Sequence, residues 1–490
     1  MLFNSFVFIL IFLPLTLAGC FLAGRIGARV AAAWLAAASL VFYGWWNPPY
    51  VLLLLASIAG NWLSGLALAR SRTSSSARRR AILGVAVGAN LLLLGYFKYA
   101  NFFLGTAGLA LGMPLGVGDV LLPLGISFFT FTQIAFLVDT YRGEVTDYDL
   151  VHYGLFVTFF PHLIAGPILH HKEIMPQFDR PDAFRPQWRN ISVGLTIFVI
   201  GLAKKVVVAD SLAPFVAPAF APDAPVALFD AWGAALAYTL QIYFDFSGYS
   251  DMAIGLAQLF GIRLPLNFDS PYKARDIIDF WRRWHMTLSR FLRDYLYIPL
   301  GGNRKGASRR YVNLMATMLL GGLWHGAGWT FVIWGGLHGL YLVINHGFLA
   351  VARNLGLAAR PQTMVAAISG RTLTFLAVVV AWVFFRAPDL ATALNVLGAM
   401  AGQNGAHAFA HWSREYSWIA GGLLVVFVAP NTQQIMTAYA PALGRVEPLG
   451  DLWRRFVWSP NAGWLVAGIA LALWSMSRLN QSSEFLYYNF

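Results

Sequence analysis

The sequence predicts an all-α polytopic membrane protein, and three features of its composition support this fold class. Of its 490 residues, 58% are hydrophobic and only 12% are charged, whereas soluble domains carry about 25% charged residues. Its 18 Trp and 19 Tyr residues suit a chain that meets membrane–water interfaces repeatedly. The net charge of +13 indicates Lys and Arg in cytoplasmic loops and against anionic lipid, rather than nucleic-acid binding.

Apolar segments recur along the whole chain. A membrane span needs about 20 apolar residues, and candidates fall at residues 2–23, 30–46, 51–69, 81–100, 120–137, 191–208, 227–246, 312–323, 330–349, 372–385, 419–429 and 464–474. Several are short or contain polar residues, so we expect re-entrant and interfacial helices among them. The pattern predicts about 11 transmembrane helices, all in a single membrane domain, residues 1–490.

Basic residues near the amino end set the expected orientation. Five arginines lie between the third and fourth candidate spans, at residues 70–80, which places this loop in the cytoplasm. Counting back two spans puts the amino terminus outside. The residues before Cys20 resemble a lipoprotein processing site, but a cleaved signal needs preceding positive charge and residues 1–20 contain none. We therefore predict that the first segment is a true span with a periplasmic amino terminus.

Residues 281–295 are predicted to form one amphipathic helix. At about 100° per residue, its aromatic side chains share one arc, and its arginines share a nearly opposite arc: Arg282, Arg283, Arg290 and Arg293. Such a helix can rest on anionic headgroups, or its guanidinium groups can bind the phosphates of a cofactor. His285 falls at the edge of the aromatic arc and is expected to point inward.

A second cluster surrounds two histidines. Trp324, His325 and Gly326 lie in an otherwise apolar stretch, where a histidine is costly unless it is paired or used. His325 is therefore either a helix-packing hydrogen-bond partner or a catalytic base. His338 lies on another side of the same stretch, and a structural role is favoured for it.

A third cluster combines carboxylates and hydroxyls at membrane depth, which mark a functional site by default. Its members are Asp245, Ser247, Tyr249 and Asp251. Because Gly248 interrupts them, we expect the helix to break here and hold water or an acceptor sugar. A purely structural break is the alternative.

Residues 162–173 offer possible metal ligands, but we predict no metal site. His162, His170, His171 and Glu173 lie in a segment bent by prolines and glycine. They lack the spacing typical of zinc ligands. Asp139, Tyr141 and Arg142, at the end of a candidate span, are interpreted as interface anchors.

Four motifs give the chain a family likeness. They are Tyr-Phe-Asp-Phe-Ser-Gly-Tyr-Ser-Asp at 243–251, Phe-Trp-Arg-Arg-Trp-His-Met-Thr-Leu-Ser at 280–289, Pro-Leu-Gly-Gly-Asn at 299–303 and Leu-Trp-His-Gly-Ala at 323–327. Together they closely resemble the membrane-bound O-acyltransferase family, nearest to its alginate O-acetyltransferase branch. The likeness extends to residues 123–131, 160–168 and 485–490.

The resemblance implies a fold, a reaction and a site. The fold would be a ring of helices around a central tunnel in the bacterial inner membrane. The family's catalytic histidine maps to His325 and its second characteristic histidine to His285, with Trp324 beside them. The implied donor is acetyl-CoA from the cytoplasm. The implied acceptor is an extracytoplasmic, alginate-like polysaccharide, reached directly or through a periplasmic partner of the SGNH, serine-hydrolase-like type.

The residues suit this chemistry. Neutral imidazole can take a proton from a hydroxyl group as that hydroxyl attacks a thioester. Cys20 is the one thiol and lies far from the histidines, and no Gly-x-Ser-x-Gly motif stands near them. We therefore expect direct transfer without a covalent intermediate on this chain. The alternatives are D-alanyl transfer to teichoic acid, peptidoglycan acetylation, and a polysaccharide transporter or flippase.

Overall fold

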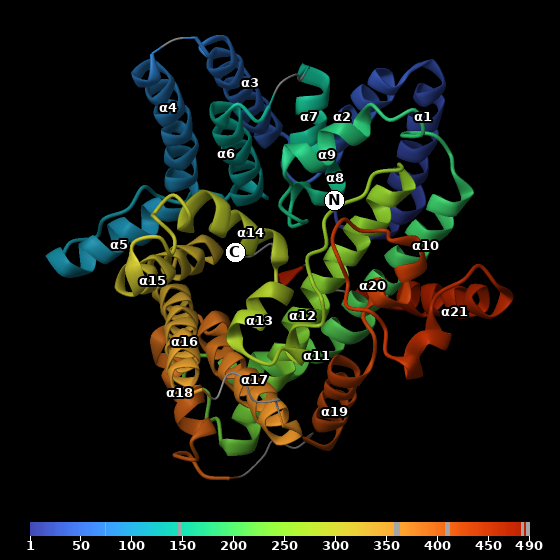
Figure 1. Ribbon diagram of the computed structural model, residues 1–490. Helices are drawn as coiled ribbons and strands as arrows, with labels where there is room; N and C mark the ends of the chain where they lie inside the picture. Colours follow the sequence, from blue (N-terminus) through green and yellow to red (C-terminus); the bar gives the residue numbers. More distant parts are fainter. Residues whose placement is uncertain (74, 146–148, 357–362, 407–411, 482–484, 487–490) are drawn as a thin grey trace.

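The computed structural model describes residues 1–490 except 74, 146–148, 357–362, 407–411, 482–484 and 487–490. The regular secondary structure of the described part is helical (Figure 1), and the one β feature there is an isolated bridge between Pro265 and Leu443. The predicted all-α class is confirmed.

Eleven of the described α-helices contain at least 16 residues. They are α2 Ala28–Gly44, α3 Pro49–Arg70, α4 Ser76–Leu94, α6 Ile126–Arg142, α10 Trp188–Ala203, α12 Leu228–Leu259, α15 Gly306–His325, α16 Trp329–Asn354, α17 Met364–Arg386, α19 Trp412–Val428 and α21 Ala462–Arg478.

Shorter helices connect these long ones. They are α1 Leu13–Ile26, α5 Ala100–Leu111, α7 Leu150–Thr158, α8 Phe160–Leu163, α9 His171–Phe178, α11 Asp210–Val216, α13 Ile277–Arg283, α14 Met286–Leu292, α18 Leu390–Met400 and α20 Thr432–Ile435. A π-helical turn, Phe8–Phe12, leads into α1, and another, Gly95–Tyr99, joins α4 to α5.

Six described segments are long and apolar enough to cross a membrane by length and composition: Phe8–Ile26, Pro49–Arg70, Ser76–Leu111, Trp188–Phe220, Trp329–Asn354 and Met364–Arg386. Their outer faces carry exposed apolar side chains, such as Leu52 at 72% and Leu92 at 76% exposure. Lipid can cover such faces, so the chain is a polytopic membrane protein. The expected count of about 11 spans, the ring and the tunnel remain predictions.

Helix α12 lies near the centre of the molecule (Figure 1) and is buried along nearly its whole length. Helix α10 packs on it through glycines: a Cβ atom at Gly201 would lie 2.6 Å from Gly248 O, and one at Gly194 would lie 2.6 Å from Gly255 O. Small residues let membrane helices approach this closely. Gly248 therefore serves helix packing, and the expected helix break at this glycine is wrong.

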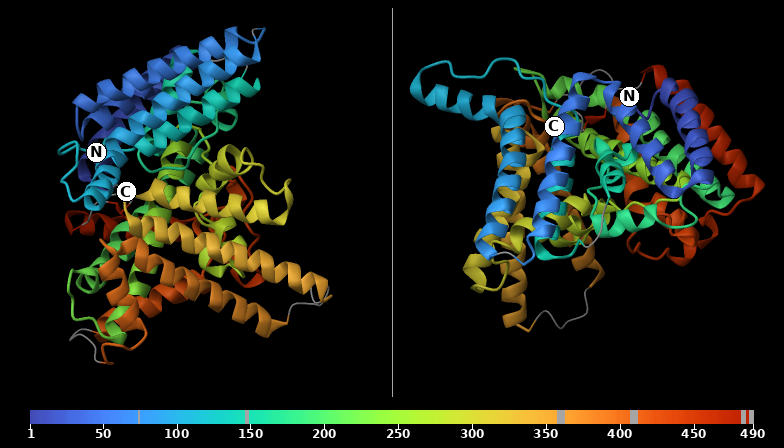
Figure 2. Two further views of the ribbon diagram at one scale, coloured as in Figure 1. Left: turned by 90° about the vertical axis from the view of Figure 1, so that its left-hand side faces the viewer. Right: turned by 90° about the horizontal axis from the view of Figure 1, so that it is seen from above.

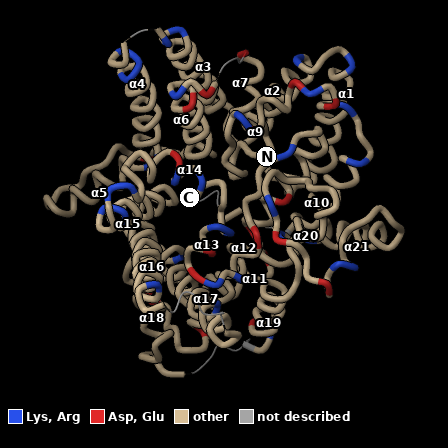
Figure 3. Tube along the Cα trace, viewed as in Figure 1, with Lys and Arg blue, Asp and Glu red and all other residues tan. Residues whose placement is uncertain are grey.

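Basic residues gather in the turn between α3 and α4. Figure 2 shows the amino terminus on the opposite side from the turn between α3 and α4, and Figure 3 shows Lys and Arg gathered at the tips of these two helices. In that turn, Arg72 donates a hydrogen bond to Val145 O at 2.6 Å. Ser75 caps α4 by accepting a hydrogen bond from Arg78 N at 3.4 Å. The sides of the membrane on which the amino terminus and the arginine-rich loop lie remain predictions.

Candidate active site

Helices α15 and α16 form a tightly packed antiparallel pair that ends at His325. A Cβ atom at Gly322 would lie 2.3 Å from Phe331 O, and one at Gly335 would lie 2.3 Å from Met318 O. After His325 the chain turns sharply, and a Cβ atom at Gly326 would meet the Phe331 ring at 2.1 Å. The glycines noted around the histidine therefore bring the two helices into contact and hold His325 at the carboxyl end of α15.

Aromatic rings surround the His325 imidazole on several sides. Its ring centroid lies 4.9 Å from Trp324, 5.0 Å from Trp334 and 5.2 Å from Phe385. The side chain is buried, with 3% exposure. This packing restricts the imidazole to one place in the core.

His285 lies between two helices rather than within one. Helix α13 ends at Arg283, α14 begins at Met286, and His285 adopts φ +42° and ψ +52°. Left-handed backbone is uncommon for residues other than glycine and is found at functional sites when the surrounding structure enforces it. The predicted continuous helix over 281–295 is wrong, because this kink separates α13 from α14.

Asn267 fixes the orientation of His285. Its Oδ1 accepts hydrogen bonds from Thr287 Oγ1 at 2.9 Å and Thr287 N at 3.3 Å, and it lies 3.1 Å from His285 Nδ1. Its backbone oxygen accepts from Met286 N at 3.0 Å. Since the two donors from Thr287 define Oδ1 as an acceptor, His285 Nδ1 must carry the hydrogen. In the neutral imidazole, Nε2 then holds a lone pair.

The kink and the helix end bring the two histidines together. The ring centroids of His285 and His325 are 6.3 Å apart, and Trp324 lies 6.0 Å from His285. Phe246 of α12 packs on His285 at 4.7 Å. The three residues singled out from the sequence here, His285, Trp324 and His325, therefore share one buried site.

The four arginines do not share one face. Arg283 pairs with Glu447 at 2.5 Å and with Asp279 at 2.8 Å. Arg290 makes a bidentate pair with Glu173 at 2.6 and 2.8 Å, and Arg293 pairs with Asp294 at 2.7 Å. Arg282 is exposed. The kink at His285 distributes these side chains, and three of them bind acidic residues of the chain itself.

The carboxylates of α12 are also engaged within the protein. Asp245 accepts a hydrogen bond from Lys205 Nζ at 2.7 Å and another from Leu486 N at 3.1 Å. Tyr249 packs edge-to-face on Phe485 at 4.9 Å. These two residues thus contact the segment near the carboxyl end.

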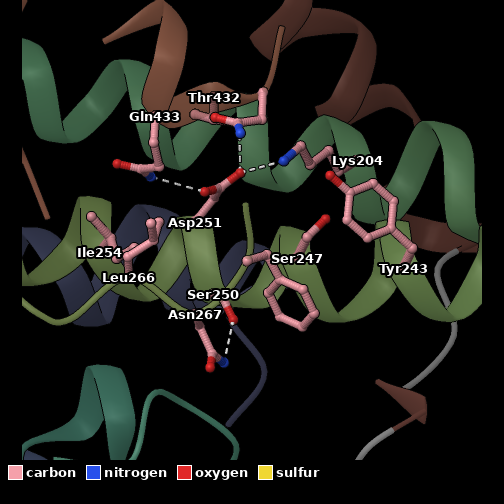
Figure 4. Close-up of a pocket in the computed structure, with 12 residues that line it drawn as sticks. Lys204, Tyr243, Ser247, Ser250, Asp251, Ile254, Leu266, Asn267, Thr432 and Gln433 are labelled. Atoms are coloured by element: carbon pink, nitrogen blue, oxygen red, sulfur yellow. Dashed lines mark hydrogen bonds and ion pairs between the residues drawn. The ribbon is translucent and has the colours of Figure 1, made fainter. Parts of the chain in front are cut away.

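Ser247 lies apart from them, on the wall of a small polar cavity beside α12 (Figure 4). On its wall, Asp251 binds Lys204 at 2.5 Å, Thr432 at 2.6 Å and Gln433 at 3.1 Å. Asn267 and Ser250 line the same cavity, and Asn267 Nδ2 donates to Ser250 Oγ at 3.2 Å. Asn267 therefore connects the cavity wall with His285.

Other histidines have structural surroundings. His338 Nδ1 accepts a hydrogen bond from Trp281 Nε1 at 3.3 Å, in line with the structural role favoured for it. Asp139 binds Tyr295 Oη at 2.8 Å and lies 3.3 Å from His171 Nδ1, so it joins α6 to its neighbours instead of serving only as an interface anchor. Within the described ranges, no group of three or more His, Cys, Asp or Glu side chains is arranged to hold a metal ion.

Two residues near the histidines were missed from the sequence. Lys98 is a cation inside the apolar segment Ser76–Leu111, a signal that could have found it because such residues are costly in a membrane. Asn267 lies in an irregular segment, and its sequence context carries no comparable signal. It becomes visible only once the chain folds residue 267 against residues 285–287.

The fold and this buried histidine pair define a polytopic membrane protein with a buried polar site. Comparison with known proteins identifies its class: residues 82–385 match the model of the membrane-bound O-acyltransferase family. The chain belongs to this family and is an O-acyltransferase.

Named relatives cover most of the chain. It is 44% identical over 444 residues to a peptidoglycan O-acetyltransferase of Helicobacter pylori, covering 85% of this chain and 82% of that protein. It is 44% identical over 405 residues to a probable alginate O-acetylase, AlgI, of Pseudomonas putida, covering 82% and 80%. A teichoic acid D-alanyltransferase of Streptococcus thermophilus is 27% identical over 288 residues, covering 55% and 69%.

Proposed function

We propose that this protein moves an acetyl group from cytoplasmic acetyl-CoA to a hydroxyl of an extracytoplasmic polysaccharide. The observation that carries the proposal is the buried pair of His285 and His325, whose ring centroids lie 6.3 Å apart inside the family-matched region. An acetyl group and a polysaccharide acceptor are supported by the names of the two relatives that are 44% identical.

In the proposed reaction, His325 acts as the general base. Its neutral imidazole takes the proton of the acceptor hydroxyl while the hydroxyl oxygen forms a bond to the thioester carbonyl carbon. The carbon–sulfur bond then breaks, and the proton passes to the departing thiolate of coenzyme A. The products are an O-acetyl ester and free coenzyme A, and no covalent intermediate forms on the chain.

His285 has a different part in this scheme. Asn267 holds its hydrogen on Nδ1, so Nε2 can accept a hydrogen bond but cannot donate one in the neutral state. His285 Nε2 is thus suited to accept a hydrogen bond from a second hydroxyl of the acceptor and so to orient it, because the attacking hydroxyl has one hydrogen and gives it to His325. Two imidazoles with separate tasks explain why both are buried side by side.

The donor would enter beside α13 and α14. Coenzyme A carries phosphate groups, and arginine binds phosphates through paired hydrogen bonds. Arg282 is exposed and available for this contact, whereas Arg283, Arg290 and Arg293 would have to exchange their carboxylate partners for phosphate. Trp324, next to His325, would line the path of the acetyl group. The acceptor would bind beside α12, near Asp245, Ser247 and Tyr249.

The proposal includes a location and a partner. The protein would lie in the bacterial inner membrane with its amino terminus in the periplasm, because the arginine-rich turn between α3 and α4 lies on the opposite side. A periplasmic SGNH, serine-hydrolase-like partner would receive the acetyl group where transfer to the polysaccharide is indirect.

Acetyl transfer to peptidoglycan is the second candidate, because one relative at 44% identity carries that name. Membranes containing the protein should be incubated with acetyl-labelled acetyl-CoA and, separately, with alginate and peptidoglycan. We expect base-labile label in one of the two glycans and none with the His325→Ala variant. Failure to consume acetyl-CoA in the presence of either glycan and of periplasmic extract would contradict the proposal.

A further inference from the structure

Lys98 contacts the carboxyl end of α15, where His325 lies. Its Nζ donates hydrogen bonds to Trp324 O at 2.5 Å, His325 O at 3.3 Å and Ser127 Oγ at 3.3 Å. The neighbouring Tyr99 donates from Oη to Leu323 O at 2.9 Å. Lys98 and Tyr99 therefore bind three successive carbonyl groups of the last turn of α15.

These carbonyl groups need partners. The last four carbonyls of an α-helix have no partner within the helix, and the interior of a membrane offers no bulk water to replace one. The carboxyl end of a helix also carries a partial negative charge, which favours a cation there. The Lys98 ammonium group donates hydrogen bonds to two of these carbonyls and places a positive charge at the helix end. It does so at His325 itself.

The local backbone explains how two adjacent residues reach the same helix end. Residues Gly95–Tyr99 form a π-helical turn between α4 and α5. Such a turn inserts an extra residue and changes the direction of the side chains, and π-turns are frequent at functional sites. Lys98 also lies 5.8 Å from the centroid of the Trp324 ring, so its charge faces an aromatic π-system as well as the carbonyls.

We propose that Lys98 is a positioning residue for His325. By holding the carbonyl groups of Trp324 and His325, it fixes the end of α15 and hence the place of the imidazole relative to His285. It acts through the backbone and does not touch the substrates. The proposal rests on the proposed function, because the position of His325 matters only where His325 takes part in acetyl transfer.

The first variant to test is Lys98→Met, which keeps the length of the side chain and removes the donor. A misplacement of about 1 Å at a reacting group can cost on the order of 10²-fold in rate, so we expect kcat to fall at least tenfold. The affinity for coenzyme A, measured by calorimetry on the purified protein, should change less than threefold. Lys98→Arg should recover part of kcat, because the guanidinium group can also donate to carbonyls.

Two further variants make the result decisive. Lys305→Met removes an exposed lysine and should leave kcat unchanged. If Lys98→Met does not give a monodisperse protein, Tyr99→Phe is tested in its place, because this change removes the hydrogen bond to Leu323 O and keeps the ring. Its kcat should fall while its affinity for coenzyme A stays unchanged. A kcat within threefold of the wild type in the variant tested, or a parallel loss of affinity and stability without recovery by Arg, would overturn the proposal. An inactive wild type would instead contradict the proposed function.

Discussion

His285 Nδ1 lies 3.1 Å from Asn267 Oδ1, and this contact determines which nitrogen of the imidazole carries the hydrogen. Thr287 donates to the same oxygen from Oγ1 and from its backbone N, so the amide cannot turn around without losing both hydrogen bonds. A buried acceptor with three donors is expensive to disturb. The kink between α13 and α14 therefore places His285 where Asn267 keeps its hydrogen on Nδ1 and its lone pair on Nε2.

Replacement of Asn267 tests this relationship. Asn267→Ala should reduce acetyl transfer at least tenfold, because the tautomer and orientation of His285 are no longer fixed. The loss of the comparable hydrogen bond behind a metal-binding histidine costs about 10–100-fold. Ser250→Ala is the matched control, since it removes only the hydrogen bond to Asn267 Nδ2 and should cost far less activity. Rates are measured with labelled acetyl-CoA. Equal activity of the two variants would show that Asn267 does not govern His285.

The packing of α15 on α16 predicts opposite results for two glycines of one helix. At Gly335 a Cβ atom would lie 2.3 Å from Met318 O, whereas at Gly347 nothing lies within 4 Å. Gly335→Ala should therefore lower the melting temperature in detergent and reduce activity, because it separates the helices next to His325. Gly347→Ala should leave stability equal or higher, since Ala favours a helix over Gly by about 1 kcal/mol. A stable, active Gly335→Ala variant would contradict the close contact.

Single cysteines test the membrane orientation. In a Cys20→Ser background, a cysteine in place of Thr73, beside the arginine-rich turn, should react only with membrane-permeant maleimide in intact cells. A cysteine in place of Met113, which is 58% exposed beyond the segment Ser76–Leu111, should react with an impermeant maleimide as well. Labelling in the reverse sense would place the arginine-rich turn outside the cell and would contradict the entry of acetyl-CoA from the cytoplasm.

Substitution of Arg282 and of Arg290 distinguishes binding of the acetyl donor from ion pairing within the protein. Arg282→Gln should raise the KM for acetyl-CoA several-fold with little effect on kcat, as expected when binding to substrate and transition state is lost equally. Arg290→Gln leaves Glu173 without its bidentate partner and should lower the melting temperature instead. An unchanged KM for acetyl-CoA in the Arg282 variant, measured in neutral detergent, would show that Arg282 does not bind the donor.

The sequence predicted the fold class and the central pair of residues because their signals are local. Apolar length identifies membrane helices, and a histidine in an apolar stretch is conspicuous at 325. His285 was singled out instead by its place on the amphipathic segment 281–295 and by the family motif around it. The kink at His285 was not predicted, because the pattern over 281–295 suits a continuous helix equally well. What breaks that helix is a tertiary contact: Asp269 N donates to Arg283 O at 2.9 Å and Met286 N donates to Asn267 O.

The same reason explains why the partners of the carboxylates and arginines were not predicted. The sequence shows that Asp245 and Arg290 are charged residues among apolar ones. It does not reveal their partners, which lie far away along the chain: Lys205 for Asp245 and Glu173 for Arg290. Gly248 illustrates the converse case. Its sequence context suggests a break, whereas the neighbouring α10 uses its missing side chain for close packing.

Single-turnover acetyl transfer by the purified His325→Ala variant tests the central claim most directly. A general base contributes about 10²–10⁴-fold to a rate, so the variant should transfer labelled acetyl at least about 100-fold more slowly than the wild type. Its melting curve and its affinity for coenzyme A should stay close to those of the wild type, since the imidazole contacts mainly aromatic rings. Transfer within tenfold of the wild-type rate by a folded His325→Ala protein would contradict the assignment of His325 as the base.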